Sequence, residues 1–443
     1  MKIPNYLRNS GLILLLICLF ALCIRVWFFV ALQPWDEQVV QDKVIIADSA
    51  RYHTQALDII TKKTFANFDP YKTPGYSLII AFIYFIFAAK PWIVLFLQLF
   101  LDTGIVIIVY FIAKEIFKSP QISLIAAFLY SISFLSAYYS VKLLTEIPFT
   151  FVLTLGILIL IKGLKKDKPL YFALTGLLIG LTPLIRTIAQ YFPLVLIFVL
   201  MLTDNTLIRK LRNIAILLIL FVVAISPWQF RNLQVYGHYS LSNVAGQVLL
   251  AWNVAAAKAE AENINRYEAE ARLIGNSLDG ITNPFERSKI KKKIAVSYIL
   301  RHPLQYAKYS LKGIVQMFLG TGRSGISDLF GIEIEPRPFG YEPLADTAYR
   351  VIRSWDNELP TIILFIKQII EYLFLIIGLV IMCMKDKKLF LLLLVMTIFY
   401  FVALTGPVGY SRYRIPIIPF YLIISAVGIF ETFKFAKNKI RGG

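Results

Sequence analysis

The sequence has few of the residues that build disulfide frameworks and metal centres. Its 443 residues include only three cysteines and three histidines. Cys18, Cys23 and Cys383 all lie in long apolar runs, so they predict neither a disulfide framework nor a metal site. The histidines are far apart and lack the spacing of zinc ligands, so the sequence does not indicate a zinc enzyme.

Charged residues are scarce as well. Asp, Glu, Lys and Arg make up 16% of the chain and hydrophobic residues 58%, whereas soluble proteins are about a quarter charged and about half apolar. Several apolar runs reach the roughly 20 residues that cross a hydrocarbon core of about 30 Å. The composition therefore predicts an all-α polytopic membrane protein. The first run, 11–33, has no small-residue cleavage site behind it, so we expect a span rather than a signal peptide.

Positive charge is distributed unevenly among the linkers between the apolar runs. One set of linkers, such as 162–168 and 385–388, is rich in lysine, and the positive-inside rule places that set in the cytoplasm together with both termini. Topology thus explains much of the formal charge of +19, and nucleic acid is not expected as a partner. The ten predicted spans are 11–33, 91–113, 121–139, 147–163, 170–185, 187–203, 214–230, 359–384, 389–405 and 415–433.

A short apolar segment, 75–89, is not counted among these spans. Its fifteen residues reach only about 22 Å at a rise of about 1.5 Å per residue. Counting it would also move every later lysine-rich linker to the outer side. We therefore predict an interfacial or re-entrant helix, which leaves an even number of spans.

The predicted topology divides the chain into three regions. Residues 1–230 form an N-terminal transmembrane module, whose first external loop, 34–90, carries the active site. Residues 231–358 form a long external loop that is a candidate cap over this site, and 359–443 supply the C-terminal transmembrane helices. We expect a plasma (inner) membrane location, with the active site on the periplasmic, or extracytoplasmic, face.

Asp48 is the strongest candidate for a catalytic group in the first external loop. If Asp48 opens a helix, Arg51 and Tyr52 follow at i+3 and i+4 and share its face. Lys72 follows in the loop, before a Pro-Gly break at 74–75. The pattern predicts that a carboxylate, a guanidinium and a phenol meet just above the membrane. The alternative is that Asp48 is only an N-cap, a position that aspartate favours.

The outer linkers differ from the inner ones in the kind of basic residue they carry. Inner linkers are mostly lysine, whereas arginine, whose planar fork suits phosphate, predominates at the outer span ends. Because ionisable groups at membrane depth are costly and mark sites, we predict a phosphate-bearing ligand at the outer face. In the alternative, the arginines anchor helix ends and Glu146 complements a helix dipole. The charged residues of this face are Asp48, Arg51, Lys72, Glu146, Arg186, Arg231, Arg412 and Arg414.

Short motifs, met in order along the chain, resemble those of the glycosyltransferase C superfamily. Asp-Ser-Ala-Arg-Tyr-His (48–53) is similar to its Asp-x-x-x-Tyr motif, in the form found in lipid A aminoarabinose transferases. Lys-Thr-Pro-Gly-Tyr (72–76) resembles the element that closes its first external loop. By pattern the chain is most similar to family 39-like and RgtA/B/C/D-like bacterial enzymes. The other motifs are Leu-Thr-Glu-Ile-Pro-Phe-Thr-Phe (144–151), Pro-Trp-Gln-Phe-Arg-Asn (227–232), a Gly-x-x-Leu-like segment (246–253, with Trp252 in place of a glycine) and Arg-Tyr-Arg-Ile-Pro (412–416).

The resemblance implies an inverting glycosyltransferase that moves a sugar from a polyprenyl-phosphate donor to an acceptor outside the cytoplasm. The implied acceptor is lipid A, another glycan, a lipid or a protein. Asp48, at the matching position, would be the base that deprotonates the acceptor hydroxyl. The implied ligands of the donor phosphate are Lys72, Arg412 and Arg414, followed by Arg186 and Arg231. The implied contacts to the sugar or the acceptor are Arg51, Tyr52, His53, Glu146 and Asn232.

Metal use separates branches of this superfamily, because its oligosaccharyltransferases hold a divalent ion with an Asp-x-Asp motif. The sequence has no Asp-x-Asp, and Asp36-Glu37 is its nearest acidic pair. Metal-independent transfer without a cofactor is therefore expected, with cationic side chains in the metal's place; a divalent cation stays an alternative. Two other functions also stay open: transport or flipping of a lipid-linked sugar, and O-antigen-ligase-like transfer of a whole glycan.

Overall fold

The computed structural model describes residues 5–63, 68–322, 325, 355–384 and 387–442. Every regular element over these residues is a helix, as the composition predicts. Residues 326–354 of the predicted external loop lie outside the described part. The elements are α1 (Asn5–Leu32), α2 (Glu37–Val39), η1 (Val40–Val44), α3 (Asp48–Lys62), α4 (Gly75–Phe87), α5 (Pro91–Phe117), α6 (Pro120–Ser131), α7 (Phe134–Ser140), α8 (Glu146–Lys166), α9 (Pro169–Ile185), η2 (Thr187–Tyr191), α10 (Pro193–Met201), α11 (Leu207–Tyr236), α12 (Val244–Gln247), η3 (Val248–Val254), α13 (Ala255–Glu262), α14 (Arg266–Ile274), α15 (Pro284–Arg301), α16 (Pro303–Leu319), α19 (Trp355–Met384), α20 (Lys388–Thr405), η4 (Gly406–Val408), η5 (Ser411–Ile417) and α21 (Ile418–Gly442).

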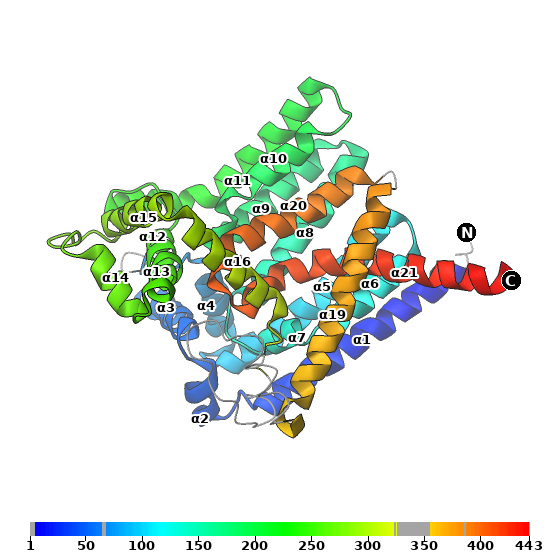
Figure 1. Ribbon diagram of the computed structural model, residues 1–443, viewed down its shortest axis with the longest axis horizontal. Coiled ribbons are helices and arrows are strands. Elements are labelled where there is room, and N and C mark those ends of the chain that lie inside the picture. Colours follow the sequence, from blue (N-terminus) through cyan, green and yellow to red (C-terminus); the bar gives the residue numbers. More distant parts are fainter. Residues whose placement is uncertain (1–4, 64–67, 323–324, 326–354, 385–386, 443) are drawn as a thin grey trace.

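The long helices gather into one bundle, and the shorter helices α12 to α16 lie at one end of it (Figure 1). Within the described residues, seven helical segments are long and apolar enough to cross a membrane, and they correspond to seven of the ten predicted spans. The predicted span 121–139 is the pair α6 and α7, which is bent by 56°. The spans predicted at 170–185 and 187–203 are shorter apolar helices. The seven long segments are Ser10–Leu32, Pro91–Phe117, Glu146–Lys166, Leu207–Tyr236, Leu359–Met384, Lys388–Val408 and Ser411–Ile440.

Local sequence signals place the helix boundaries in this apolar chain. Pro91 and Pro169 occupy first turns of α5 and α9, where the missing N–H has no helical partner to lose. Lys118 and Asp167 end α5 and α8 in the left-handed conformation that terminates many helices. These turns also carry the basic linkers, so the same residues stop the helices and mark one side of the bundle.

The segment predicted to be interfacial or re-entrant forms α4, which has only 13 residues. It begins in close contact with α9, because a Cβ atom at Gly75 would lie 2.6 Å from the carbonyl oxygen of Leu184. No larger residue fits there without moving backbone. The Pro-Gly break at 74–75 therefore fixes the point where the preceding loop turns into α4.

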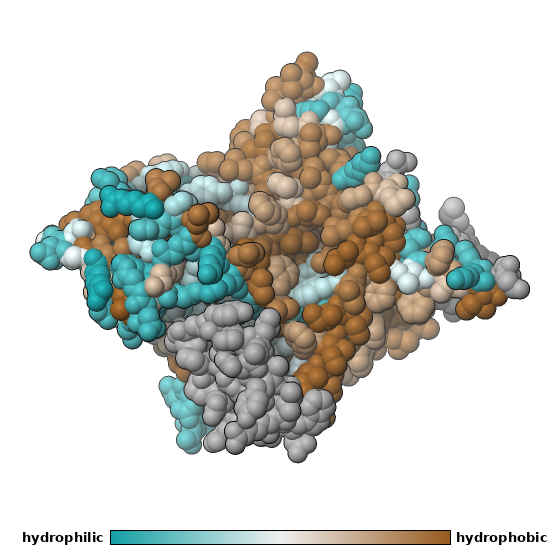
Figure 2. Space-filling model, viewed as in Figure 1, coloured by the Kyte–Doolittle hydropathy of each residue, from teal (hydrophilic) through white to brown (hydrophobic). Residues whose placement is uncertain are grey.

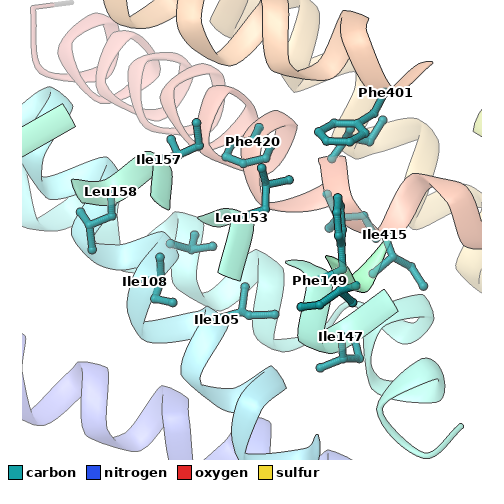
Figure 3. Close-up of a cluster of buried hydrophobic side chains, with 14 of the residues drawn as sticks. Ile105, Ile108, Ile147, Phe149, Leu153, Ile157, Leu158, Phe401, Ile415 and Phe420 are labelled. Carbon is teal, nitrogen blue, oxygen red and sulfur yellow. The ribbon is translucent and has the colours of Figure 1, made fainter. Parts of the chain in front are cut away.

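Helix α8 lies at the centre of the core, where Phe149 faces Ile105 of α5 and Phe401 of α20 (Figure 3). The rings of Phe149 and Phe401 meet edge to face with centroids 5.7 Å apart. Gly176 and Gly180 of α9 let α11 approach closely, since Cβ atoms at these positions would collide with it. Lipid tails are as apolar as leucine, so close packing of this kind supplies much of the helix–helix attraction in a membrane.

On the face shown in Figure 2, hydrophobic side chains cover the bundle, and hydrophilic ones gather over α13 to α15 and at the helix ends. This distribution is the inverse of a soluble protein's surface and suits contact with lipid tails. The chain is a multi-pass integral membrane protein.

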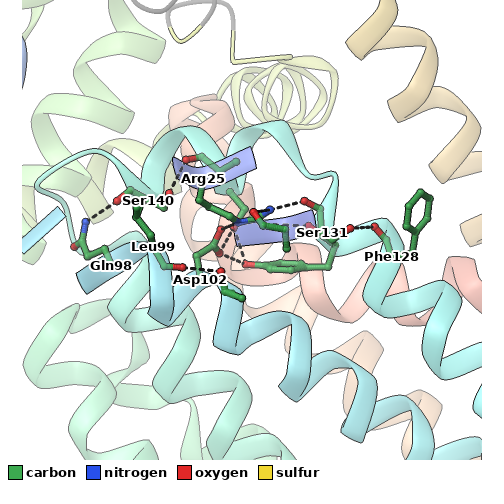
Figure 4. A network of polar contacts seen from close by, with 12 residues as sticks. Arg25, Gln98, Leu99, Asp102, Phe128, Ser131 and Ser140 are labelled. Carbon is green, nitrogen blue, oxygen red and sulfur yellow. Dashed lines mark hydrogen bonds and ion pairs between the residues drawn. The ribbon is translucent and has the colours of Figure 1, made fainter. Parts of the chain in front are cut away.

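An ion pair lies fully buried among the membrane helices (Figure 4). Arg25 of α1 donates from Nε to Oδ2 of Asp102 on α5 over 2.9 Å, and it also donates to the carbonyl oxygen of Ser131. Tyr130 and Ser136 donate to Oδ1 of Asp102 over 2.7 and 2.5 Å. Because Ser131 ends α6 at the bend, the network holds the broken span α6–α7 against α1 and α5. None of these residues is among those predicted from the sequence to have a role.

Replacing Asp102 with alanine is expected to destabilise the protein by about 3–5 kcal/mol, because the Arg25 charge would stay buried without its partner. The double variant Arg25→Met/Asp102→Leu should lose less, since it buries no unpaired charge. Thermal unfolding of the detergent-solubilised proteins measures both. If the double variant unfolds at a temperature as low as the single variant does, the ion pair is not the reason for the loss.

Candidate active site

Helix α3 begins at Asp48, as the sequence predicts. Its N-cap is Ala47, which has a left-handed φ of 49°, an uncommon value for a residue with a side chain. The alternative in which Asp48 itself is the N-cap is therefore not what the structure shows. The side chain of Asp48 instead points toward other elements of the chain.

Two cations hold the carboxylate of Asp48. Lys72 donates from Nζ to Oδ1 over 2.9 Å, and Arg412 donates from Nη2 to Oδ2 over 3.4 Å. Lys72 lies in the loop before α4, whereas Arg412 lies on η5, 364 residues away from Asp48. The exposed side-chain fractions are 34% for Asp48, 16% for Lys72 and 25% for Arg412, so solvent reaches the cluster but does not surround it.

A second ion pair lies beside the first. Arg186, at the end of α9, donates from Nη1 to Oε1 of Glu146 over 2.9 Å, and Glu146 opens α8. The ring of Tyr413 lies near both guanidinium groups, 5.4 Å from Arg186 and 5.0 Å from Arg412. The other carboxylate oxygen of Glu146, Oε2, is buried and has no hydrogen-bond partner among the described residues. The second pair therefore keeps one strong acceptor unused.

Aromatic rings form the side of the site next to Lys72. The Nζ atom of Lys72 lies 5.3 Å from the ring centroids of Tyr52 and Tyr71, within the range of cation–π attraction. Tyr52 is buried and meets Tyr76 edge to face at 5.1 Å. Tyr76 in turn donates its hydroxyl to Gln98 of α5 over 2.7 Å. The cation that touches Asp48 is thus positioned by rings anchored in the membrane bundle.

Electrostatics keep the Asp48–Lys72 pair charged at neutral pH. Burial raises the pKa of Asp48, but the charges of Lys72, Arg412 and Arg186 outweigh burial and bring that pKa below its ordinary value of 3.8. Burial lowers the pKa of Lys72, but Tyr52 and Asp48 raise it to a net value above the ordinary 10.5. The contribution of Asp48 to stability is therefore complete above pH 3.8 and is lost as the pH falls through its lowered pKa.

The same linkage predicts a pH-dependent effect of the substitution Lys72→Met. We expect wild type to be more stable than this variant between about pH 4 and pH 10, with the difference shrinking as Asp48 gains a proton in acid or Lys72 loses one in alkali. Thermal unfolding across pH measures the difference. Lys62→Met is the control, because Lys62 makes only an exposed pair with Asp58. A Lys72→Met loss that does not vary with pH would contradict this electrostatic explanation.

Arg51 and His53, both predicted for the site, have polar partners other than Asp48. Arg51 is half exposed and pairs with Asp69 over 3.3 Å, so it does not meet Asp48 as the helical spacing predicts. His53 shares a hydrogen bond of 2.8 Å between its Nδ1 and the hydroxyl of Tyr84, and burial lowers its pKa. The spacing of Asp48 and Arg51 correctly predicted that both lie on helix α3. It did not predict the direction of the long arginine side chain, which turns to Asp69.

Arg231 and Asn232 form a clamp at the end of α11. Arg231 donates from Nη2 to the carbonyl oxygen of Phe68 over 3.0 Å and from Nη1 to Oδ1 of Asn232 over 2.8 Å. Asn232 is fully buried and donates to the carbonyl oxygen of Ser240 over 2.7 Å. Trp228 packs edge to face on Phe68 at 5.0 Å. The Pro-Trp-x-x-Arg-Asn motif thus holds the loop that carries Lys72, and in the structure neither Arg231 nor Asn232 contacts Asp48.

Arg414 is not part of the Asp48 cluster either. Its side chain is almost fully buried, and its terminal nitrogens donate to oxygen atoms at the end of α16 and on α19. The sequence placed it with Arg412 because the two are neighbours in one motif. The structure shows that they face different partners.

Tyr413, Tyr76 and Gln98 belong to the site's surroundings but are not among the residues predicted from the sequence. Tyr413 lies inside the quoted motif 412–416, so its place between two arginines was the available signal. Gln98 is a polar residue inside a predicted span, a position that indicates a role for any polar side chain. No group of three metal-binding side chains occurs in the part of the chain that the structure describes.

Two kinds of comparison connect this geometry with known proteins. Residues 71–229 match the family model described as dolichyl-phosphate-mannose-protein mannosyltransferase. Two structures of the oligosaccharyltransferase AglB from Archaeoglobus fulgidus superpose on 98% and 96% of this chain, with TM-scores of 0.53 and 0.54 and identities of 13% and 16%. The chain has the glycosyltransferase C fold. It spans about half of those AglB chains, 52% and 50%.

Two further comparisons gave a weaker match and no match. A structure of ArnT from Cupriavidus metallidurans, bound to undecaprenyl phosphate, aligns over 93% of this chain and 77% of that one, with a TM-score of 0.40 and 13% identity. No curated protein matches the sequence significantly. The matched family stretch contains Lys72, Glu146 and Arg186, whereas Asp48 and Arg412 lie outside it and join the site through the fold.

Proposed function

We propose that this protein is an integral-membrane inverting glycosyltransferase, which moves a sugar from a polyprenyl-phosphate donor to a hydroxyl-bearing acceptor on the extracytoplasmic face. The observation that carries the proposal is the carboxylate of Asp48 held between Lys72 and Arg412, with the Glu146–Arg186 pair beside it. The family match and the glycosyltransferase C fold support it. The lysine-rich linkers support a topology with both termini in the cytoplasm, and the proposed location is the plasma (inner) membrane.

In the proposed reaction, the ionised carboxylate of Asp48 accepts the proton of the acceptor hydroxyl. The hydroxyl oxygen forms a bond to the anomeric carbon from the face opposite the donor phosphate. The bond between that carbon and the phosphate oxygen breaks, and the phosphate leaves with the electron pair. Configuration is inverted because attack and departure occur on opposite faces. A positioned base contributes about 10²–10⁴-fold to such a step.

The cations around Asp48 have a second role in this reaction. A leaving phosphate gains negative charge, and preorganised cations stabilise that charge most when they are partly shielded from water. Lys72 and Arg412 meet this condition, and Arg186 lies next to them. When the donor phosphate draws these cations toward itself, Asp48 loses opposing charge and its pKa rises. Donor binding would therefore make Asp48 a stronger base.

Glu146 and Tyr52 are the best-placed residues for contact with the sugar or the acceptor. The buried, unpartnered Oε2 of Glu146 is a strong acceptor for a hydroxyl group of the substrate. Tyr52 contributes a ring face beside Lys72. Arg51, His53 and Asn232 make contacts away from Asp48, so their predicted role in substrate binding has less support from the geometry. Arg231 and Arg414 likewise stay predictions as phosphate ligands, since the terminal nitrogens of both guanidinium groups donate to oxygen atoms away from Asp48.

The substitution Asp48→Asn tests the proposal. It keeps the size of the side chain and removes the base, so we expect transfer to fall by about 10²–10⁴-fold at normal expression. Mass spectrometry of envelope glycans and lipids, from cells lacking the gene and complemented with each variant, measures the transferred sugar. Asp58→Asn is the matched control, because Asp58 lies on the same helix, is partly exposed and pairs with the exposed Lys62.

Near-wild-type transfer by Asp48→Asn would falsify Asp48 as the base. Movement of intact lipid-linked sugar across proteoliposome membranes, without transfer, would favour the transporter instead. A product that gains a whole glycan rather than one sugar would favour the ligase-like reaction.

A further inference from the structure

Arg414 has an environment that differs from that of every other arginine considered for the site. Its side chain is only 3% exposed. Nη1 donates to the carbonyl oxygens of Met317 and Phe318 and to the hydroxyl of Tyr372, the first and last over 3.1 Å. Nη2 donates to the carbonyl oxygen of Gly320 over 3.0 Å and to Oε1 of Gln368 over 2.8 Å. A phosphate could reach these donors only by displacing protein oxygens.

The hydrogen-bond acceptors of Arg414 lie mainly at the C-terminal end of helix α16. Met317 and Phe318 belong to the last turn of α16, and Gly320 is the C-cap. The last carbonyl groups of a helix lack helical partners and carry the negative end of the helix dipole, so a buried cation is stabilised there. In the described residues no carboxylate pairs with Arg414; the nearby Glu371 pairs with Lys367. The charge of Arg414 is therefore balanced by the end of α16.

Helix α16 also packs directly on the segment that leads to Arg412. A Cβ atom at Gly313 would lie 2.5 Å from the carbonyl oxygen of Pro407, and one at Gly320 would lie 2.9 Å from Cβ of Ser411. At Gly313 the contact to η4 is to backbone atoms, and at Gly320 only the short side chain of Ser411 lies between α16 and η5. Any shift of the end of α16 is thus passed to η5 without a flexible spacer.

The shape of η5 gives the two arginines different directions. A 3₁₀-helix has about three residues per turn, so residues two apart point about 240° from each other around its axis. Arg414 faces the end of α16, and Arg412 faces Asp48. Holding the side chain at one of these positions on the short helix therefore constrains the direction of the other.

We propose that Arg414 is a positioning residue that locks η5 against the end of α16 and thereby keeps Arg412 in contact with Asp48. This proposal deepens the proposed function and rests on it for its meaning, since the contact it protects is the one made by the catalytic base. It also connects the external region 231–322 with the site through backbone carbonyl groups.

The reactivity of Asp48 tests this coupling without any sugar substrate. A water-soluble carbodiimide modifies protonated carboxyl groups, and peptide mass spectrometry gives the rate at Asp48 as a function of pH. The charged groups around Asp48 are Lys72 from the loop, Arg412 from η5, and Arg186 with its partner Glu146 from α9 and α8. Removing Arg412 takes away one of the charges that lower the Asp48 pKa, so Arg412→Gln should raise the modification rate near pH 5 by about three- to tenfold.

Arg414→Gln should raise the rate in the same direction, although Arg414 does not touch Asp48. In the double variant Arg412→Gln/Arg414→Gln the rate should equal that of Arg412→Gln alone, because Arg414 acts through Arg412. Arg287→Gln is the matched control, since Arg287 also donates to backbone carbonyls but lies on α15 with no contact to η5. It should react at the wild-type rate.

Two results would overturn the proposal: a wild-type rate for Arg414→Gln, or additive effects in the double variant. If Arg414→Gln does not fold, Arg414→Lys replaces it. Lysine keeps the charge at the end of α16 but cannot reach all the acceptors of Arg414. A wild-type modification rate at Asp48 in Arg414→Lys would then overturn the proposal. The readout does not require transfer, so loss of the proposed function would appear only in the Asp48→Asn experiment.

Discussion

The contact of one carboxylate with two cations, at the rim of a membrane bundle, constrains the rest of this protein. Lys72 and Arg412 are mostly shielded from water, and a shielded cation needs a counter-charge. Asp48 supplies it in the structure. A phosphate group would compete for the same two cations and release the carboxylate for proton transfer. The site is therefore suited to a ligand that carries negative charge together with a group that must lose a proton.

Most of the surrounding structure keeps the three charged side chains together. The clamp of Trp228, Arg231 and Asn232 holds the loop of Lys72, while Gln98 and Tyr76 support the rings beneath it. These contacts join side chains to neutral groups rather than to opposite charges. Asp48, Lys72 and Arg412 therefore interact with one another and not with the supporting residues. Farther inside, the Arg25–Asp102 pair fixes the bent span that leads toward Glu146.

Hydropathy placed the long helices well, because the length and apolar character of a membrane span are properties of the local sequence. Asp48 at the start of α3 and the break before α4 were predictable for the same reason. The partner of Asp48 on η5 was not, since no local pattern reports a contact across 364 residues. Arg412 and Arg414 look equivalent in the sequence, and only the turn of η5 separates a residue of the site from one that holds α16.

The most direct measurement is a structure of the protein with undecaprenyl phosphate bound, determined in a lipid nanodisc. The arrangement of the site predicts phosphate density within hydrogen-bond distance of Lys72 Nζ and the Arg412 guanidinium, with Asp48 released from at least one of them and Arg414 still on the end of α16. Phosphate bound to Arg231 or Arg414, with the Asp48–Lys72 contact unchanged, would contradict it.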